Sequence, residues 1–195
     1  MALPVAMDVA DEASVMAAYD AGASAFGCID TVVANAGAAI PGSSLDLSVD
    51  DFDRMVSVNL KGVFLTVREG ARRMVEAGIG DGRVTIISSI TADEASRGIA
   101  TYAATKAAVA QMGRCLALDW ANKGINVNIL CPGYIRTELN SDRWELPPGQ
   151  KMLAAFPRKR VMESESLDAM ALYLSSSASA QMTGSVITID DGQTL

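Results

Sequence analysis

Short runs rich in valine and isoleucine alternate along this chain with longer segments of helical character, and this alternation constrains the fold more than any other feature. The apolar runs predict buried strands, and the segments between them predict helices that connect one strand to the next. The pattern is typical of βαβ units and predicts an α/β fold with a parallel sheet covered on both faces. The strands are expected at residues 3–9, 29–35, 83–88, 125–131 and 185–190, and the helices at residues 11–25, 48–77, 101–122 and 163–176.

The chain contains no histidine among its 195 residues. This excludes Ser-His-Asp and Cys-His catalysis and every histidine-ligated metal site, so proton transfer has to use Tyr, Lys, Ser, Asp or Glu. The three cysteines, Cys28, Cys115 and Cys131, are widely spaced and form no C-x-x-C pair. We therefore expect no disulfide framework and no metal site, and we expect reduced thiols in the cytoplasm.

The formal net charge is −7, and no block of basic residues interrupts the sequence. Nucleic acid and anionic membrane surfaces are poor partners for such a chain. No apolar run reaches the ~18 residues that a membrane helix needs. The N-terminal residues have no basic region and Asp8 breaks their apolar stretch, so we expect no signal peptide. These observations predict a cytoplasmic protein that binds neither nucleic acid nor a membrane.

Tyr102 and Lys106 form the clearest pair of chemically useful side chains. Residues four apart on a helix lie on one face, one turn from each other. A free phenol has a pKa of about 10 and is a poor base at neutral pH. A nearby ammonium group favours the phenolate, so we expect Lys106 to lower the pKa of Tyr102 and to make it a proton-transfer group.

Other polar or small residues follow the predicted strands. Ser88 and Ser89 end one strand, and Ser89 precedes Tyr102 by thirteen positions. Asn35, Ala36 and Gly37 follow another strand, where a glycine lets a ligand approach the backbone closely. In a parallel sheet the carboxyl ends of the strands lie at one edge, and ligands bind there. The sequence therefore predicts one site at that edge.

Together these motifs resemble the short-chain dehydrogenase/reductases, which are NAD(P)-dependent oxidoreductases with a Rossmann fold. The matching stretches follow the family's order and spacing from Asp8 to Gly192, and the loop after the fourth strand resembles the ordinary reductase branch. The stretches are ANAGA (34–38), VNLKGVF (58–64), VTIISS (84–89), YAATKAAV (102–109), INVNILCPGYIRTEL (125–139) and MTGSVITIDDG (182–192). The resemblance implies a Rossmann-like, doubly wound parallel sheet with helices on both faces, formed by residues 1–195 as one domain.

The resemblance also implies roles for four catalytic residues. Tyr102 is the acid/base that handles the proton of the substrate oxygen while a hydride passes between the nicotinamide and a carbon. Lys106 lowers the pKa of Tyr102 and holds the nicotinamide ribose. Ser89, rather than Ser88, orients the substrate oxygen. Asn59 anchors a water in a proton relay behind Lys106, although an ordinary polar helix residue is the alternative.

By the same resemblance, further residues would bind NAD or NADP. Asp8 and Val9 would hold the adenine ring, with a simple capping role as the alternative for Asp8. The adenosine side would be lined by Asn35, Ala36 and Gly37, and the nicotinamide and pyrophosphate would be bordered by Pro132, Gly133, Ile135 and Thr137. The preference between NAD and NADP cannot be read from these residues, because the segment that selects the cofactor is not among them.

The glycine-rich turn between a first strand and a first helix, which holds the pyrophosphate in this family, has no counterpart here. The glycines at Gly78, Gly80 and Gly82 follow a helix and precede a strand, which is the wrong polarity. We therefore expect an N-terminally truncated fold that begins at the family's third strand and binds dinucleotide poorly. A gene fragment and a catalytically silent binding or assembly subunit are the alternatives. We also predict that strand 3–9 pairs directly with strand 29–35, because it would otherwise have no place in the sheet.

The expected substrate is a small alcohol or ketone. Residues 138–160 follow the carboxyl end of a strand and would cover the substrate. Members of this family are commonly dimers or tetramers built on their two long helices, here about 59–77 and 101–121. A homodimer or homotetramer is therefore expected.

Overall fold

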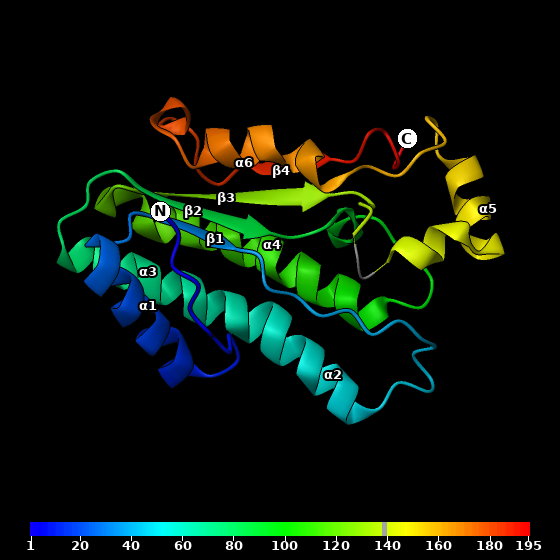
Figure 1. Cartoon of the computed structure of the whole chain (residues 1–195), viewed down its shortest axis with the longest axis horizontal. Helices are drawn as coiled ribbons and strands as arrows, with labels where there is room; N and C mark the ends of the chain where they lie inside the picture. Colours follow the sequence, from blue (N-terminus) through cyan, green and yellow to red (C-terminus); the bar gives the residue numbers. More distant parts are fainter. Residues whose placement is uncertain (138–139) are drawn as a thin grey trace.

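Four parallel strands form one sheet in the computed structural model, which describes residues 1–137 and 140–195. The strands β1 (Thr31–Ala34), β2 (Gly82–Ile87), β3 (Ile125–Pro132) and β4 (Val186–Ile189) lie side by side in chain order. Val32 pairs with Val84, and Ile86 pairs with Ile129. All carboxyl ends therefore lie at one edge of the sheet (Figure 1), as the alternating pattern predicted.

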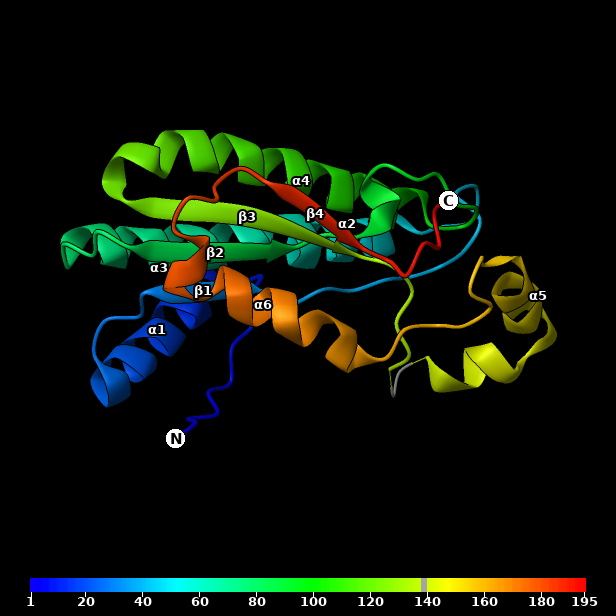
Figure 2. The same cartoon turned by 90° about the horizontal axis from the view of Figure 1, so that it is seen from above.

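Helices cover both faces of this sheet, which confirms the predicted doubly wound α/β architecture. The helices α3 and α4 pack on one face, α1 packs against α3, and α6 lies on the other face (Figures 1 and 2). The bounds of the α-helices are α1 (Glu12–Phe26), α2 (Val49–Val56), α3 (Val63–Glu76), α4 (Ala100–Trp120), α5 (Pro147–Ala155) and α6 (Asp168–Leu174). Short 3₁₀ turns occupy Ile90–Ala92, Ala121–Lys123, Ser141–Glu145, Ser164–Leu167 and Ser177–Ser179.

The core lies between the sheet and the α3–α4 layer. Val84, Ile86, Val127 and Ile129 of the two central strands have no more than 1% of their surface exposed. Such β-branched side chains fit a pleated surface that is buried on both faces. This core holds the carboxyl ends of β2 and β3 rigidly beside the first turns of α4.

The N-terminal segment differs from the prediction, because residues 3–9 form no strand and do not pair with β1. Val9 instead packs against the helix at Gly62, where a Cβ atom would lie only 2.7 Å from Val9 Cγ2. Leu3, Val5 and Met7 line a groove that separates this segment from β1. The packing of Val9 on the helix holds the segment away from β1, so the predicted direct pairing is wrong.

The helical region predicted at residues 48–77 is continuous but has a change of pitch in its middle. Ser48 caps α2 by accepting a hydrogen bond from the Asp51 N–H at 3.0 Å. Between α2 and α3 the chain takes a π-helical turn over Ser57–Gly62. Such turns are rare and are often found at functional sites. This turn contains Asn59.

A small second core stands at the carboxyl edge of the sheet, around α5 (Figure 2). Trp144, Phe156 and Val161 are buried together there. A Cβ atom on Gly149 would lie 2.0 Å from the Arg143 carbonyl oxygen, so only glycine lets α5 pack this closely. The described part of the stretch 138–162 is therefore more regular than its sequence predicted, because its aromatic residues pack on one another.

Candidate active site

Lys106 projects from α4 into the protein and is only 3% exposed. Its Nζ atom donates a hydrogen bond to the Ile87 carbonyl oxygen at 2.9 Å and lies 5.6 Å from the centroid of the Tyr102 ring. Burial lowers the pKa of Lys106 to about 8. The expected proximity of Tyr102 and Lys106 on one helix face is therefore present, with the ammonium group enclosed.

Burial is the main influence on the pKa of the Tyr102 phenol. Burial raises the pKa of Tyr102 above its ordinary value, and the Ser89 hydroxyl beside it acts in the opposite direction. Lys106 is not among the groups that shift this pKa, so its expected lowering of the Tyr102 pKa stays a prediction. Tyr102 is consequently a neutral phenol near pH 7, which is the form that donates a proton.

The two serines at the end of β2 have different surroundings. The Ser88 hydroxyl donates a hydrogen bond to the Lys106 carbonyl oxygen at 2.8 Å, which ties β2 to α4. Ser89 accepts a hydrogen bond from the Thr91 N–H at 3.2 Å and borders the cavity that contains Tyr102. Ser88 is thus tied to α4 and Ser89 lines the cavity, and the substrate-orienting role of Ser89 stays a prediction.

Asn59 is fully buried in the π-helical turn and acts as a bridge. Its Oδ1 atom accepts from the Ala38 N–H at 2.7 Å, and its Nδ2 atom donates to the Ala38 carbonyl oxygen at 2.8 Å and to the Thr105 hydroxyl at 3.1 Å. A Cβ atom on Gly37 would lie 3.6 Å from both Asn59 Oδ1 and Lys106 Nζ. Asn59 therefore ties the loop after β1 to α4, immediately beside Lys106.

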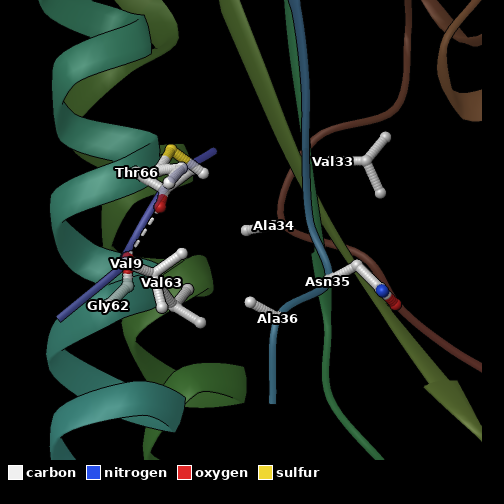
Figure 3. A pocket seen from close by; sticks show the side chains of 9 residues that line it. Val9, Val33, Ala34, Asn35, Ala36, Gly62, Val63 and Thr66 are labelled. Atoms are coloured by element: carbon white, nitrogen blue, oxygen red, sulfur yellow. Dashed lines mark hydrogen bonds between the residues drawn. The ribbon is translucent and has the colours of Figure 1, made fainter. Parts of the chain in front are cut away.

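Several of the residues expected on the adenosine side border a narrow cleft of about 100 Å³ between β1 and the helix at Gly62. Figure 3 shows the side chains of Ala34 and Ala36 pointing into this cleft and the Asn35 side chain pointing away from it. Val9 closes the cleft from the helix side. Asp8 does not line the cleft, because its carboxylate accepts a hydrogen bond from the Ala10 N–H at 2.9 Å and closes a turn.

Of the residues expected near the nicotinamide, two line a cavity and two do not. Gly133 and Ile135 border the same cavity as Ser89 and Tyr102, whereas Pro132 ends β3 and is buried. Thr137 is exposed, and its N–H donates to Asn140 Oδ1 at 2.9 Å. Thr137 is not among the described residues that line the cavity.

The large cavity has a volume of about 870 Å³ and opens at the carboxyl edge of the sheet. Ser89 and Tyr102 contribute polar groups, and the Thr91 hydroxyl beside them is the one buried polar side-chain atom of the described residues without a hydrogen-bond partner. Sequence reasoning missed the charged members of the wall among the described residues, Arg97 and Arg143. The aromatic residues at positions 134, 144 and 156 were the only local signal of a structured wall there.

Comparison with known proteins decides the family. A family model described as enoyl-(acyl carrier protein) reductase matches residues 1–194. The chain is 36% identical to the D-threitol dehydrogenase of Mycolicibacterium smegmatis over 190 residues, which are 97% of this chain and 72% of the relative. A crystal structure of a short-chain type dehydrogenase/reductase from Mycobacterium marinum superposes with a TM-score of 0.92 at 34% identity, and the match covers 98% of this chain and 75% of that one. The chain belongs to the short-chain dehydrogenase/reductase family.

Another solved member of the family is the gluconate 5-dehydrogenase of Burkholderia cenocepacia, in complex with NADP and tartrate. It superposes with a TM-score of 0.90 at 35% identity, with 96% of this chain and 73% of that chain covered. The chain thus spans about three quarters of the length of these relatives. The motif-based resemblance is confirmed at the level of family and fold.

Within residues 1–137 and 140–195, no group of three or more His, Cys, Asp or Glu side chains is placed to hold a metal ion. In the same part of the chain, no helix combines the length and apolar character needed to cross a membrane.

Proposed function

We propose that this chain is an NAD(P)-dependent oxidoreductase that transfers a hydride between a nicotinamide and a small hydroxyl or carbonyl substrate. The observation that carries the proposal is that Ser89 and Tyr102 both line a cavity whose size suits a small ligand, with Lys106 Nζ 5.6 Å from the centroid of the Tyr102 ring. Asn59 holds the loop beside them through three hydrogen bonds. Relatives that oxidise polyols and sugars support an alcohol or ketone as the substrate.

The residues present suit the adenosine and nicotinamide ends of a dinucleotide better than its pyrophosphate. Gly37 has no side chain beside Lys106 Nζ, so a ribose hydroxyl can approach the ammonium group there. Gly133 and Ile135 would border the nicotinamide, and Val9 and Ala36 the adenosine. When bound, the cofactor supplies or accepts the hydride. No glycine-rich turn that follows a strand and opens a helix occurs in these 195 residues, so we propose that affinity for the dinucleotide is weak.

In the direction of reduction, Tyr102 donates its phenolic proton to the carbonyl oxygen of the substrate. Ser89 donates a hydrogen bond to the same oxygen and so holds it in line with the phenol. The phenolate that remains is stabilised by the Lys106 ammonium group, which has few other charges to interact with in its buried position. In the direction of oxidation the same groups act in reverse order.

Titration with NADH and NADPH tests the proposal. We expect the fluorescence of both cofactors to show saturable binding that is weak, together with carbonyl-dependent oxidation of the bound cofactor. A control titration with adenosine diphosphate measures the contribution of the adenosine cleft alone. The absence of any binding up to millimolar cofactor would contradict the proposal and favour the second candidate, a catalytically silent binding or assembly subunit.

Paired serine variants test the assignment at the end of β2. Ser89→Ala is expected to reduce turnover by ~100-fold, because the substrate oxygen loses a positioned donor. Ser88→Ala removes a bond to the Lys106 backbone at a residue that does not line the cavity, so we expect a loss of ~1 kcal/mol in the free energy of unfolding and nearly full turnover. Steady-state kinetics and urea unfolding of both variants provide the comparison. The reverse ranking of turnover would show that Ser88 is the substrate-facing residue.

We further propose a homodimer or homotetramer built on the two long helical regions. Phe52 and Phe64 lie on the first of these regions with 46% and 37% of their surface exposed, and Val49 is 74% exposed. Large apolar side chains that remain exposed on neighbouring turns are typical of an interface between subunits. Sedimentation velocity on the full chain measures the state directly.

A further inference from the structure

The wall of the large cavity carries a charge opposite to that of the whole chain. The formal net charge of the protein is −7, yet the only charged side chains among the described lining residues are Arg97 and Arg143. No aspartate or glutamate within residues 1–137 and 140–195 contributes to this lining. The cavity wall therefore attracts anions, although the chain as a whole is acidic. The described lining residues include no carboxylate that would repel an anion.

Arg143 is held in place by aromatic rings. Its guanidinium carbon lies 5.7 Å from the centroid of the Tyr134 ring and 5.6 Å from that of Trp144. Those two rings meet edge to face with their centroids 5.8 Å apart, and Tyr134 also stacks on Phe156. Guanidinium groups packed on aromatic faces lose less conformational freedom when they bind a partner.

The backbone at Arg143 is fixed as well. Its N–H donates to the Asn140 carbonyl oxygen at 3.1 Å, and Gly149 of α5 packs directly against its carbonyl oxygen. The Asn140 side chain is anchored inside this loop, since its Oδ1 atom accepts from the Thr137 N–H and the Trp144 indole N–H and its Nδ2 atom donates to the Ile135 carbonyl oxygen. Asn140 therefore shapes the wall around Arg143, and Arg143 itself is exposed to solvent.

Arg97 reaches the cavity from the loop before α4. Within the described part of the chain it forms no ion pair and no hydrogen bond. The next residue, Gly98, has a φ of +76° and accepts a hydrogen bond from the Gly42 N–H at 2.8 Å. This bond joins the loop of Arg97 to the opposite loop of the cavity, so the position of the arginine is set by the fold.

We propose that the substrate carries an anionic group, which Arg143 and Arg97 bind while its hydroxyl or carbonyl carbon lies at Ser89 and Tyr102. The inference rests on the proposed oxidoreductase function and adds the chemical class of the substrate. A guanidinium group binds a carboxylate or a phosphate through paired N–H donors, and both anions share this recognition. Tyr134 borders the same cavity as Tyr102 and supports Arg143, so the reacting group and the anion would share one space.

Calorimetric titration of the full chain with three compounds of one carbon skeleton tests this inference. D-gluconate carries a carboxylate, D-glucitol 6-phosphate carries a phosphate, and D-glucitol is neutral. We expect at least one of the two anions to bind ~10-fold tighter than glucitol, and the stronger of them identifies the source of the charge. The affinity for the anion should fall as salt is added, because both arginines are exposed to solvent, whereas that for glucitol should not change.

Arginine variants then locate the contact. Arg143→Gln is expected to lower the affinity for the anion ~10-fold, and Arg143→Lys should recover part of it by restoring the charge without the paired donors. Arg97→Gln should show a smaller loss. Arg114→Gln changes an exposed arginine on α4 outside the cavity and should leave the affinity unchanged. Thermal melts of each variant confirm that the fold is retained.

The two proposals fail in distinguishable ways. Equal affinity for gluconate, glucitol 6-phosphate and glucitol, or anion binding that is unaffected in Arg143→Gln and Arg97→Gln, would overturn the anionic substrate. Loss of NADPH affinity in these variants would also overturn it, because the arginines would then serve the cofactor. Arginine-dependent anion binding in a chain that binds no cofactor would instead overturn the oxidoreductase function.

Discussion

Replacement of Tyr102 by phenylalanine is expected to lower turnover by about 10²- to 10⁴-fold. The change removes one oxygen atom, and with it the proton donor for the substrate oxygen. Burial raises the pKa of this phenol, so the wild-type group is protonated at neutral pH and available for donation. Among the described residues that border the cavity, Tyr134 is the only other one with a phenol, so its variant shows whether the loss can be compensated.

The second tyrosine of the cavity provides a matched control. Tyr134→Phe removes a phenolic oxygen from the same cavity but leaves its ring stacked on Phe156 and beneath Arg143. We expect this variant to keep turnover within a few fold of wild type. Stopped-flow measurement of NADPH oxidation, with circular dichroism as a check on folding, compares the two variants. Near wild-type turnover in Tyr102→Phe would refute the assigned role.

Lys106→Met is expected to separate function from stability. The ammonium group is buried, and it donates a hydrogen bond to the Ile87 carbonyl oxygen. Methionine has a similar length and carries no charge, so the desolvation cost disappears. We expect cofactor affinity and turnover to fall together, whereas the free energy of unfolding at pH 7 should stay constant or rise by up to about 3 kcal/mol.

The difference in unfolding free energy between the wild type and Lys106→Met should depend on pH, because folding lowers the pKa of Lys106. In the folded chain the pKa of Lys106 is lowered to about 8 from its ordinary value of 10.5, so between these values the unfolded chain binds more protons. The stability of the wild type relative to Lys106→Met should therefore rise with pH across this window, and the full penalty should apply below it. Urea unfolding at about pH 7 and about pH 10 measures the effect.

Lys123→Met supplies the control for the lysine experiment, because Lys123 is exposed just beyond α4. The difference in unfolding free energy between the wild type and Lys123→Met should show no comparable change with pH. A loss of several kcal/mol in Lys106→Met at pH 7 would mean that the ammonium group holds the fold together, and the separation of function from stability would be wrong.

The arginine wall illustrates what local sequence patterns leave open. Arg97 lies in a loop and Arg143 lies in a stretch without regular periodicity, so neither residue stands out in the sequence. Their common position depends on Gly98 meeting Gly42 and on Tyr134 meeting Trp144. Such contacts join loops that have no repeating spacing between them, and only the folded chain brings them together.

The N-terminal segment shows a related limit. Residues 3–9 have the alternating apolar character of a strand, and β-propensity describes a fit to a half-buried surface. Whether a neighbouring strand is there to pair with is a property of the tertiary structure. In this structure the close approach of Val9 to Gly62 holds the segment on the helix and away from the edge of β1.

By itself, the sequence determined the parallel sheet, the order of its elements and the placement of Tyr102 and Lys106 on one helix face. Each of these depends on periods of two or about four residues, which act between near neighbours in the chain. Only the tertiary structure decided that burial raises the pKa of Tyr102, that Asn59 bridges a loop and α4, and that two arginines line the same cavity as Ser89 and Tyr102. These features depend on burial and on contacts between residues far apart in the chain, which local spacing does not encode.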